Sequence, residues 1–234
     1  ALSSAASDVY KRQAFISVFD VIGPNMVGPS SSHTAGAASI ALLAGKMLGE
    51  RIKSVKFILY GSFAATYNGH GTDRALLGGI MGFATDDVRI RDSFEYADKA
   101  GIEYSFEENT NETDIHPNTV DIVMTGEGGR RLTVRGESLG GGKVMLTRIN
   151  GVKVQFTGEY HALIAVYEDH PGVVAAITAA LNDNNVNIAF LRVYREKKGG
   201  RAYTIVESDE EITAEAVEKI RATSLVDDIM LIRR

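Results

Sequence analysis

The chain has 234 residues, 44% hydrophobic and 24% charged, a composition typical of one large or two small globular domains rather than of a disordered protein. Its net charge of -5 argues against nucleic-acid or anionic-membrane binding, because both need a basic face. The lack of cysteine excludes disulfides, a cysteine nucleophile and Cys-ligated zinc or iron–sulfur sites within these residues. No run reaches the ~18 apolar residues of a membrane span, and residues 1–13 lack the apolar core of a signal peptide, so we expect a cytoplasmic protein.

The first region, residues 14–158, mixes strands and helices between glycine-rich turns, and residues 1–13 suit a disordered leader or a remnant of cloning. Hydrophobic patterning and capping residues predict an α+β layer with several helices on one face. Predicted helices cover 34–48, 72–83 and 93–100; predicted strands cover 15–22, 55–60, 103–106, 119–124, 131–135, 144–149 and 152–156.

The second region, residues 160–234, follows a regular order of elements. We predict a strand at 162–167, a helix beginning at Pro171, strands at 186–193 and 203–207, a helix capped by Thr213, and a strand at 228–232. This βαββαβ order indicates a ferredoxin-like fold of about seventy residues, a small size for a lone domain, so we expect it to pair with another copy.

The tract GPSSSHTAGA, residues 28–37, is the strongest local signal of a site. Ser30, Ser31, Ser32, His33 and Thr34 crowd the start of the predicted helix 34–48. Free backbone N–H groups, hydroxyls and the positive end of the helix dipole favour a phosphate or carboxylate, and His33 could act as acid or base. A capped helix after a polar loop explains the same residues, and both interpretations stay open.

A second glycine-rich tract, LYGSFAATYNGHGTD at residues 59–73, predicts a loop that brings Ser62, Thr66, His70, Thr72 and Asp73 together after a strand. We treat His70, Thr72 and Asp73 as candidate binding residues, although on its own the tract favours a tight connection with Asp73 as a helix cap.

Three further patterns give little evidence of a catalytic or binding site. The turn HPNT at 116–119 favours a structural role, and SLGGGK at 138–143 lacks the first glycine and the final Ser/Thr of a phosphate-binding P-loop. No dinucleotide-binding glycine motif or metal-ligand spacing of histidines occurs. A triad of Ser31, His33 and Asp73 has little support without a nucleophile elbow.

In the second region, His170 and Gly172 lie where the first predicted strand joins the first predicted helix, and Asn187 directly precedes Ile188. Gly172 would let a ligand carboxylate approach the helix, and Asn187 could bind an amino group. The alternative is a plain α+β domain in which Asp169 or His170 caps its helix.

The ordered motifs FDVIGPNMVGPSSSHTAGA, LYGSFAATYNGHGTD, HPNT and SLGGGK resemble the beta chains of bacterial iron–sulfur-dependent L-serine dehydratases, from about Val18 to the C-terminus. The tract EDHPGVVAAITAALNDNNVNIAF resembles an ACT domain, a module that commonly binds amino acids where two copies pair. The first region is also similar to the allosteric substrate-binding domain of some phosphoglycerate dehydrogenases.

The resemblance implies deamination of L-serine to pyruvate and ammonia, with a [4Fe-4S] cluster held by the cysteines of a separate alpha chain. It implies that this chain binds no metal, is inactive alone, and forms a homodimer through its ACT domain. His33 is then the candidate catalytic base, and Ser30, Ser31, Ser32 and Thr34 bind the serine carboxylate or hold the loop against the alpha chain.

Two other functions fit the same residues. The main alternative is a non-enzymatic amino-acid sensor, an anion-binding domain joined to an ACT module. A regulatory tail of a longer dehydrogenase is the third, although a nucleotide-binding fingerprint is missing.

Overall fold

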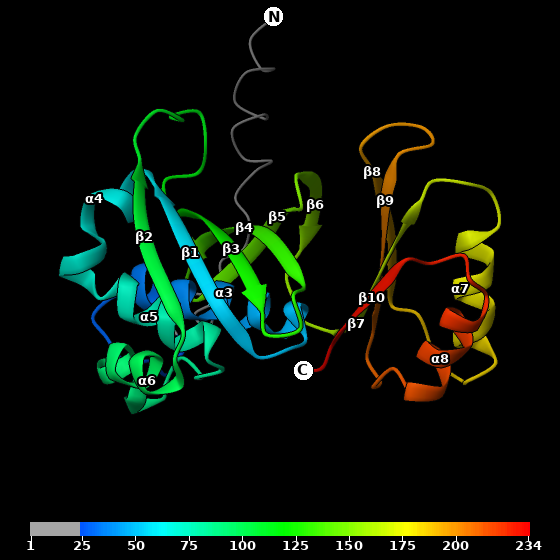
Figure 1. Cartoon of the computed structure of the whole chain (residues 1–234), viewed down its shortest axis with the longest axis horizontal. Coiled ribbons are helices and arrows are strands. Elements are labelled where there is room, and N and C mark those ends of the chain that lie inside the picture. Colours follow the sequence, from blue (N-terminus) through cyan, green and yellow to red (C-terminus); the bar gives the residue numbers. More distant parts are fainter. Residues whose placement is uncertain (1–23) are drawn as a thin grey trace, which may run out of the picture.

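The computed structural model describes residues 24–234, so the predicted leader 1–13 and strand 15–22 lie outside the described residues. Two sheets organise this part of the chain (Figure 1). Its helices include none that is long and apolar enough to cross a membrane.

The first sheet has six strands in the order β2-β1-β3-β4-β5-β6. β1 and β2 are parallel, and every other neighbouring pair is antiparallel. The bounds are β1 (Ile52–Tyr60), β2 (Glu103–Asn109), β3 (Thr119–Gly126), β4 (Arg131–Gly140), β5 (Lys143–Ile149) and β6 (Val152–Phe156).

Helices cover one face of this sheet, as predicted, and together these elements form the N-terminal unit (Figure 1). Ile40 of α3, Phe57 of β1, Leu76 of α5 and Ile122 of β3 are fully buried in its core. At Gly79 a Cβ would lie 2.3 Å from the carbonyl oxygen of Ala38, so the glycine permits close packing of α3 and α5. The helical segments are η2 (Ser31–Gly36), α3 (Ala37–Leu48), α4 (Gly61–His70), α5 (Thr72–Ile80), η3 (Val88–Asp92) and α6 (Ser93–Ala100).

The second sheet is antiparallel, in the order β10-β7-β9-β8, and has the predicted βαββαβ connectivity. We call it, with its two helices, the C-terminal unit. Its elements are β7 (His161–Glu168), α7 (Val173–Asn182), β8 (Phe190–Arg195), β9 (Arg201–Ser208), α8 (Ala214–Ala222) and β10 (Asp228–Ile232).

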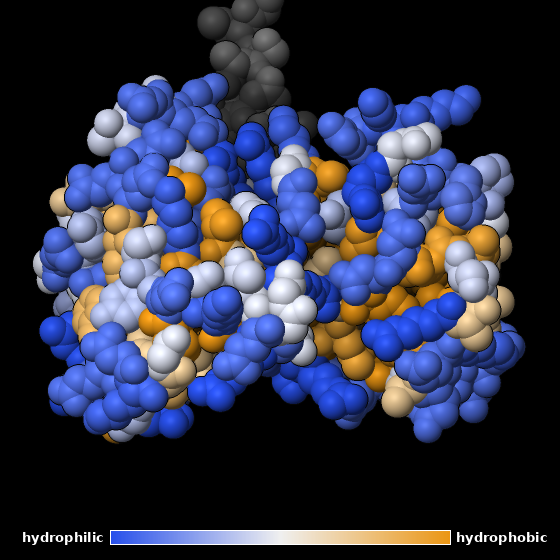
Figure 2. Space-filling model, viewed as in Figure 1, coloured by the Kyte–Doolittle hydropathy of each residue, from blue (hydrophilic) through white to orange (hydrophobic). Residues whose placement is uncertain are grey.

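Alternation along β7 separates two apolar faces, because successive strand side chains point to opposite sides. Leu163 and Ala165 belong to the core beneath α7 and α8, whereas Ile164 and Val166 join the core of the N-terminal unit. Both faces of β7 are therefore covered. Figure 2 shows hydrophilic residues over most of the viewed surface, with hydrophobic residues gathered near β7 and β10.

Local structure differs from the sequence prediction at several element boundaries, for example at the helix predicted over 72–83, which ends at Ile80, and most clearly at four places. The predicted loop after β1 is the helix α4, because the carbonyl of Pro117 accepts the N–H groups of Ser62 and Phe63 at its start. The predicted helix 34–48 is split into a π-helical turn, η2, and α3. The helix predicted from Pro171 begins at Val173, and the strand predicted from 186 begins at Phe190. Gly172, at φ 99°, ends the turn before α7 in the left-handed region that favours glycine.

Candidate functional site

The GPSSSHTAGA tract forms the π-helical turn η2, which lies between α4, α5 and β4. Ser30 caps this turn: its hydroxyl accepts the N–H of His33 at 3.1 Å, and its carbonyl accepts the N–H of Thr34 at 2.9 Å. The N–H of Ala35 also bonds to the carbonyl of Ser30. Several backbone donors that the sequence suggested for an anion therefore have partners within the turn.

His33 is the centre of a cluster of hydroxyl groups that we call the His33 site. Its Nε2 lies 2.9 Å from Oγ of Ser62, at the start of α4. Its Nδ1 lies 3.1 Å from Oγ of Ser32 and 3.4 Å from Oγ of Ser30. The edge of the ring packs on Phe63, with 5.4 Å between centroids. Hydroxyls on both nitrogens and an aromatic neighbour fix the plane of the imidazole.

Burial of the imidazole, and next the nearby His70, lower the pKa of His33 below its ordinary value of 6.5. The centroids of the two imidazole rings lie 5.1 Å apart, and the ring planes are inclined at 37° to each other. A lowered pKa keeps His33 neutral at physiological pH, so one ring nitrogen retains a lone pair. A neutral imidazole held by hydroxyls can accept a proton from a bound molecule.

The other predicted residues of this region are spread around His33. His70 is exposed at the end of α4, and its carbonyl accepts the hydroxyl of the buried Thr34 at 3.2 Å. Ser31, in the same π-helical turn, is half-buried. Thr72 and Asp73 are buried at the start of α5, and the hydroxyl of Thr72 has no hydrogen-bond partner.

Asp73 does not hydrogen-bond to His33. Its carboxylate accepts the N–H of Arg74 at 2.8 Å, and desolvation raises its pKa above the ordinary value of 3.8. The triad of Ser31, His33 and Asp73 is therefore not formed.

Four sequence motifs meet at the His33 site. The carbonyl of Pro117, in the HPNT turn, accepts the N–H of Ser62 at 2.7 Å. Ser138, the first residue of SLGGGK, packs against Gly36, where an added Cβ would lie 2.0 Å from its Oγ. The sequence placed Ser62 in a glycine-rich loop without selecting it as a site residue. The helix α4 carries it to His33, and no local sequence signal indicates that pairing.

The residues present do not fit a metal or an iron–sulfur cluster. Clusters are held mainly by cysteine thiolates, and the chain has no cysteine. Across residues 24–234, no three His, Asp or Glu side chains are grouped as a metal would need. The groups that this chain itself contributes to the site are imidazole and hydroxyl groups.

The candidate ligand residues of the C-terminal unit lie at two loops. His170 is exposed before α7, with its Nδ1 3.1 Å from the carbonyl oxygen of Pro171. Gly172 precedes the helix, and a Cβ there would meet no atom within 4 Å. Asn187 is exposed before β8. No hydrogen bond joins the side chains of His170 and Asn187, both of which lie in the described part of the chain.

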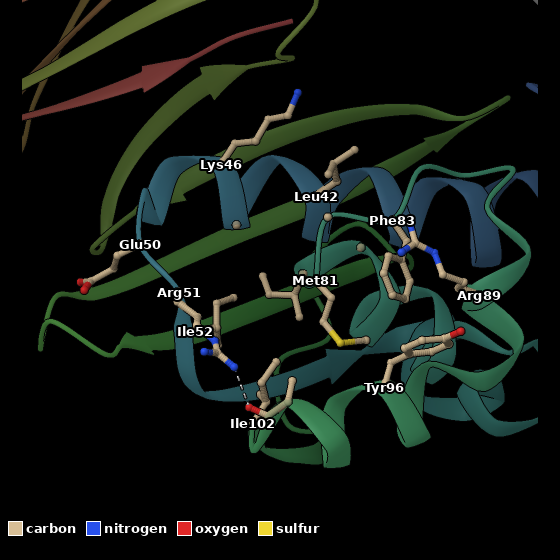
Figure 3. A pocket seen from close by; sticks show the side chains of 15 residues that line it. Leu42, Lys46, Glu50, Arg51, Ile52, Met81, Phe83, Arg89, Tyr96 and Ile102 are labelled. Atoms are coloured by element: carbon tan, nitrogen blue, oxygen red, sulfur yellow. Dashed lines mark hydrogen bonds between the residues drawn. The ribbon is translucent and has the colours of Figure 1, made fainter.

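A cavity of about 520 Å³ lies away from the His33 site, between α3, α5, α6 and the start of β1 (Figure 3). Its walls are largely apolar, with Leu42, Met81 and Phe83 facing it. The guanidinium of Arg51 donates to the carbonyl of Ala100 at its rim. None of the sequence-predicted site residues lines this cavity.

Comparison with known proteins gives two family matches. The serine dehydratase beta chain family matches residues 17–148, and the ACT domain family matches residues 161–224. The L-serine dehydratase beta chain of Peptoniphilus asaccharolyticus is 43% identical over 84% of this chain and 89% of its own length. The probable L-serine dehydratase beta chain of Bacillus subtilis is 38% identical over 87% and 92%. A D-3-phosphoglycerate dehydrogenase of Archaeoglobus fulgidus is 27% identical over 79% of this chain but only 35% of its own length.

Proposed function

Because the chain belongs to the serine dehydratase beta chain family, we propose that it is the beta subunit of an L-serine dehydratase, a lyase that converts L-serine to pyruvate and ammonia. The observation that carries the proposal is the His33 site: a family motif forms a turn that holds a neutral imidazole between hydroxyls of two segments.

The reaction needs a base. Removing the α-proton of L-serine and the hydroxide of its side chain, as water, leaves an enamine, which becomes an imine and is hydrolysed to pyruvate and ammonia. The unprotonated nitrogen of His33 accepts the α-proton. The hydroxyls of Ser30, Ser31, Ser32 and Thr34 bind the substrate carboxylate or hold the turn against the partner chain. His70, Thr72 and Asp73 border the substrate.

We assign the [4Fe-4S] cluster to a separate alpha chain, since thiolate ligands are missing here. The alpha chain is thus the required partner, and the His33 site faces it. We also propose that residues 14–158 and 160–234 act as two domains. The second forms a homodimer and binds an amino acid near His170, Gly172 and Asn187.

The test is anaerobic turnover of L-serine to pyruvate by this chain alone and by its mixture with a reconstituted alpha chain. Turnover in the mixture only is the expected result. His33→Gln should then lower kcat by about 10²-fold or more, the usual contribution of a positioned base. Full turnover by His33→Gln would remove the assigned role, and turnover by this chain alone would contradict the placement of the cluster.

A second candidate is an amino-acid-sensing regulator without catalysis. The match to part of a D-3-phosphoglycerate dehydrogenase favours it, because that match covers both units of this chain but only about a third of the enzyme. Binding of L-serine by the chain, without turnover in any mixture, would support this candidate.

A further inference from the structure

A buried cationic side chain lies on the first sheet, on the face away from the helices. Arg135 alternates along β4 with Val134 and Gly136, and Gly136 faces Ile40 of α3. The side chain of Arg135 therefore points to the opposite face. It is nevertheless only 6% exposed. Burial of a guanidinium requires compensating partners, because an unpaired charge is strongly destabilising there.

Two carboxylates and a phenol supply those partners. Asp121, directly opposite on β3, accepts from Nε of Arg135 at 2.6 Å and from Nη2 at 2.8 Å. Glu112 accepts from Nη1 at 2.7 Å and from Nη2 at 3.1 Å. The guanidinium also lies over the ring of Tyr60 and donates to its hydroxyl at 3.0 Å. Tyr60 in turn donates to Asp121 at 2.8 Å.

Two of these partners, Tyr60 and Glu112, lie on segments that connect to the start of α4, beside the His33 site. Tyr60 is the last residue of β1 and directly precedes Gly61 and Ser62 at the start of α4. Glu112 belongs to the connection between β2 and β3, which lies at the same end of the sheet (Figure 1). That connection ends in the HPNT turn, whose Pro117 carbonyl accepts the N–H of Ser62.

We infer that Arg135 is a positioning residue for the His33 site. It binds Tyr60 and Glu112 on the two segments that hold the start of α4, and so keeps the hydroxyl of Ser62 against the imidazole of His33. The glycine at 61 makes this junction tight, since a Cβ there would lie 2.7 Å from the Pro117 carbonyl oxygen.

The first experiment needs no activity. The full chain contains five histidines, so their ring signals can be followed by NMR during a pH titration, with His33 assigned from His33→Gln. Glu112→Gln and Tyr60→Phe each weaken the contact of Arg135 with one of the two segments that hold the start of α4. We expect both to raise the pKa of His33 toward 6.5, because a looser α4 admits water to the ring.

Glu207→Gln is the matched control, because Glu207 is a buried carboxylate paired with Arg192 on the C-terminal sheet. It should leave the titration of His33 unchanged. Glu112 is 38% exposed, so Glu112→Gln is expected to fold even if Arg135→Met does not. Unchanged His33 titrations in folded Glu112→Gln and Tyr60→Phe would overturn the inference, as would an equal shift in the control.

The second arm rests on the proposed function and uses the complex with the alpha chain. Glu112→Gln should lower kcat about tenfold with little change in KM, because the base is misplaced rather than lost. Glu207→Gln should leave kcat unchanged. If the wild-type complex fails to convert L-serine, the proposed function is wrong, and the His33 titration alone decides the positioning role of Arg135.

Discussion

Gly36 offers the most direct test of how the His33 site is packed. Its backbone is right-handed helical, at φ -62° and ψ -42°, so alanine meets no backbone strain. The added Cβ would lie 2.0 Å from Oγ of Ser138 and 2.7 Å from its Cβ. Rotation of the hydroxyl relieves the first contact but not the second. We expect Gly36→Ala to lower the free energy of unfolding by about 1–3 kcal/mol, the usual cost of overpacking.

The assay is thermal unfolding of the full chain, where 1 kcal/mol corresponds to roughly 2–4 °C at this size. Gly69→Ala is the control, because nothing lies within 4 Å of a Cβ at that position in α4. Alanine there should stabilise the helix by about 0.5–1 kcal/mol. Ser138→Gly should rescue Gly36→Ala, with a coupling free energy of about 1 kcal/mol or more. If Gly36→Ala melts like Gly69→Ala, or Ser138→Gly rescues nothing, the packing argument is refuted.

Three further predictions follow from the same structure. His70→Gln removes the neighbouring imidazole, whose electrostatic effect lowers the pKa of His33, so NMR titration should show that pKa rising toward 6.5. Because the folded pKa of His33 lies below the unfolded one, native stability should fall as pH drops through 6.5, and less steeply in the variant. Ile164 lies in the core shared by both units, so Ile164→Ala should lower the free energy of chemical unfolding by about 2–5 kcal/mol. Val123 is 37% exposed, so Val123→Ala should change that free energy by less than about 0.5 kcal/mol. Equal effects would contradict the shared core. Gly172→Ala forces alanine to φ 99°, so the melting temperature and the affinity for L-serine, measured by calorimetry, should both fall. Unchanged affinity would show that this turn does not bind the ligand.

Much of the secondary structure was predictable from local sequence. The strands within residues 24–234 were predictable because their apolar residues alternate or run together. Gly101 follows the last residue of α6 and is left-handed at φ 71°, as a glycine after a helix should be. Thr213 caps α8 by accepting the N–H of Ala216, again as predicted. The helix α4 was missed because GSFAATYNGH contains two glycines and little helical periodicity, and its start is stabilised by the distant Pro117.

The sequence by itself determined the chemical groups of the candidate site and the order of its motifs. Ser30, Ser32 and His33 are neighbours in the chain, and their contacts follow from one turn. Only the tertiary structure decided that Ser62 is the partner of Nε2, since 29 residues separate it from His33. The same holds for Arg135, which is buried by acids from two other segments. Patterns along a chain record burial and local bonding, whereas a pair formed across a sheet depends on register and packing that are set by the whole core.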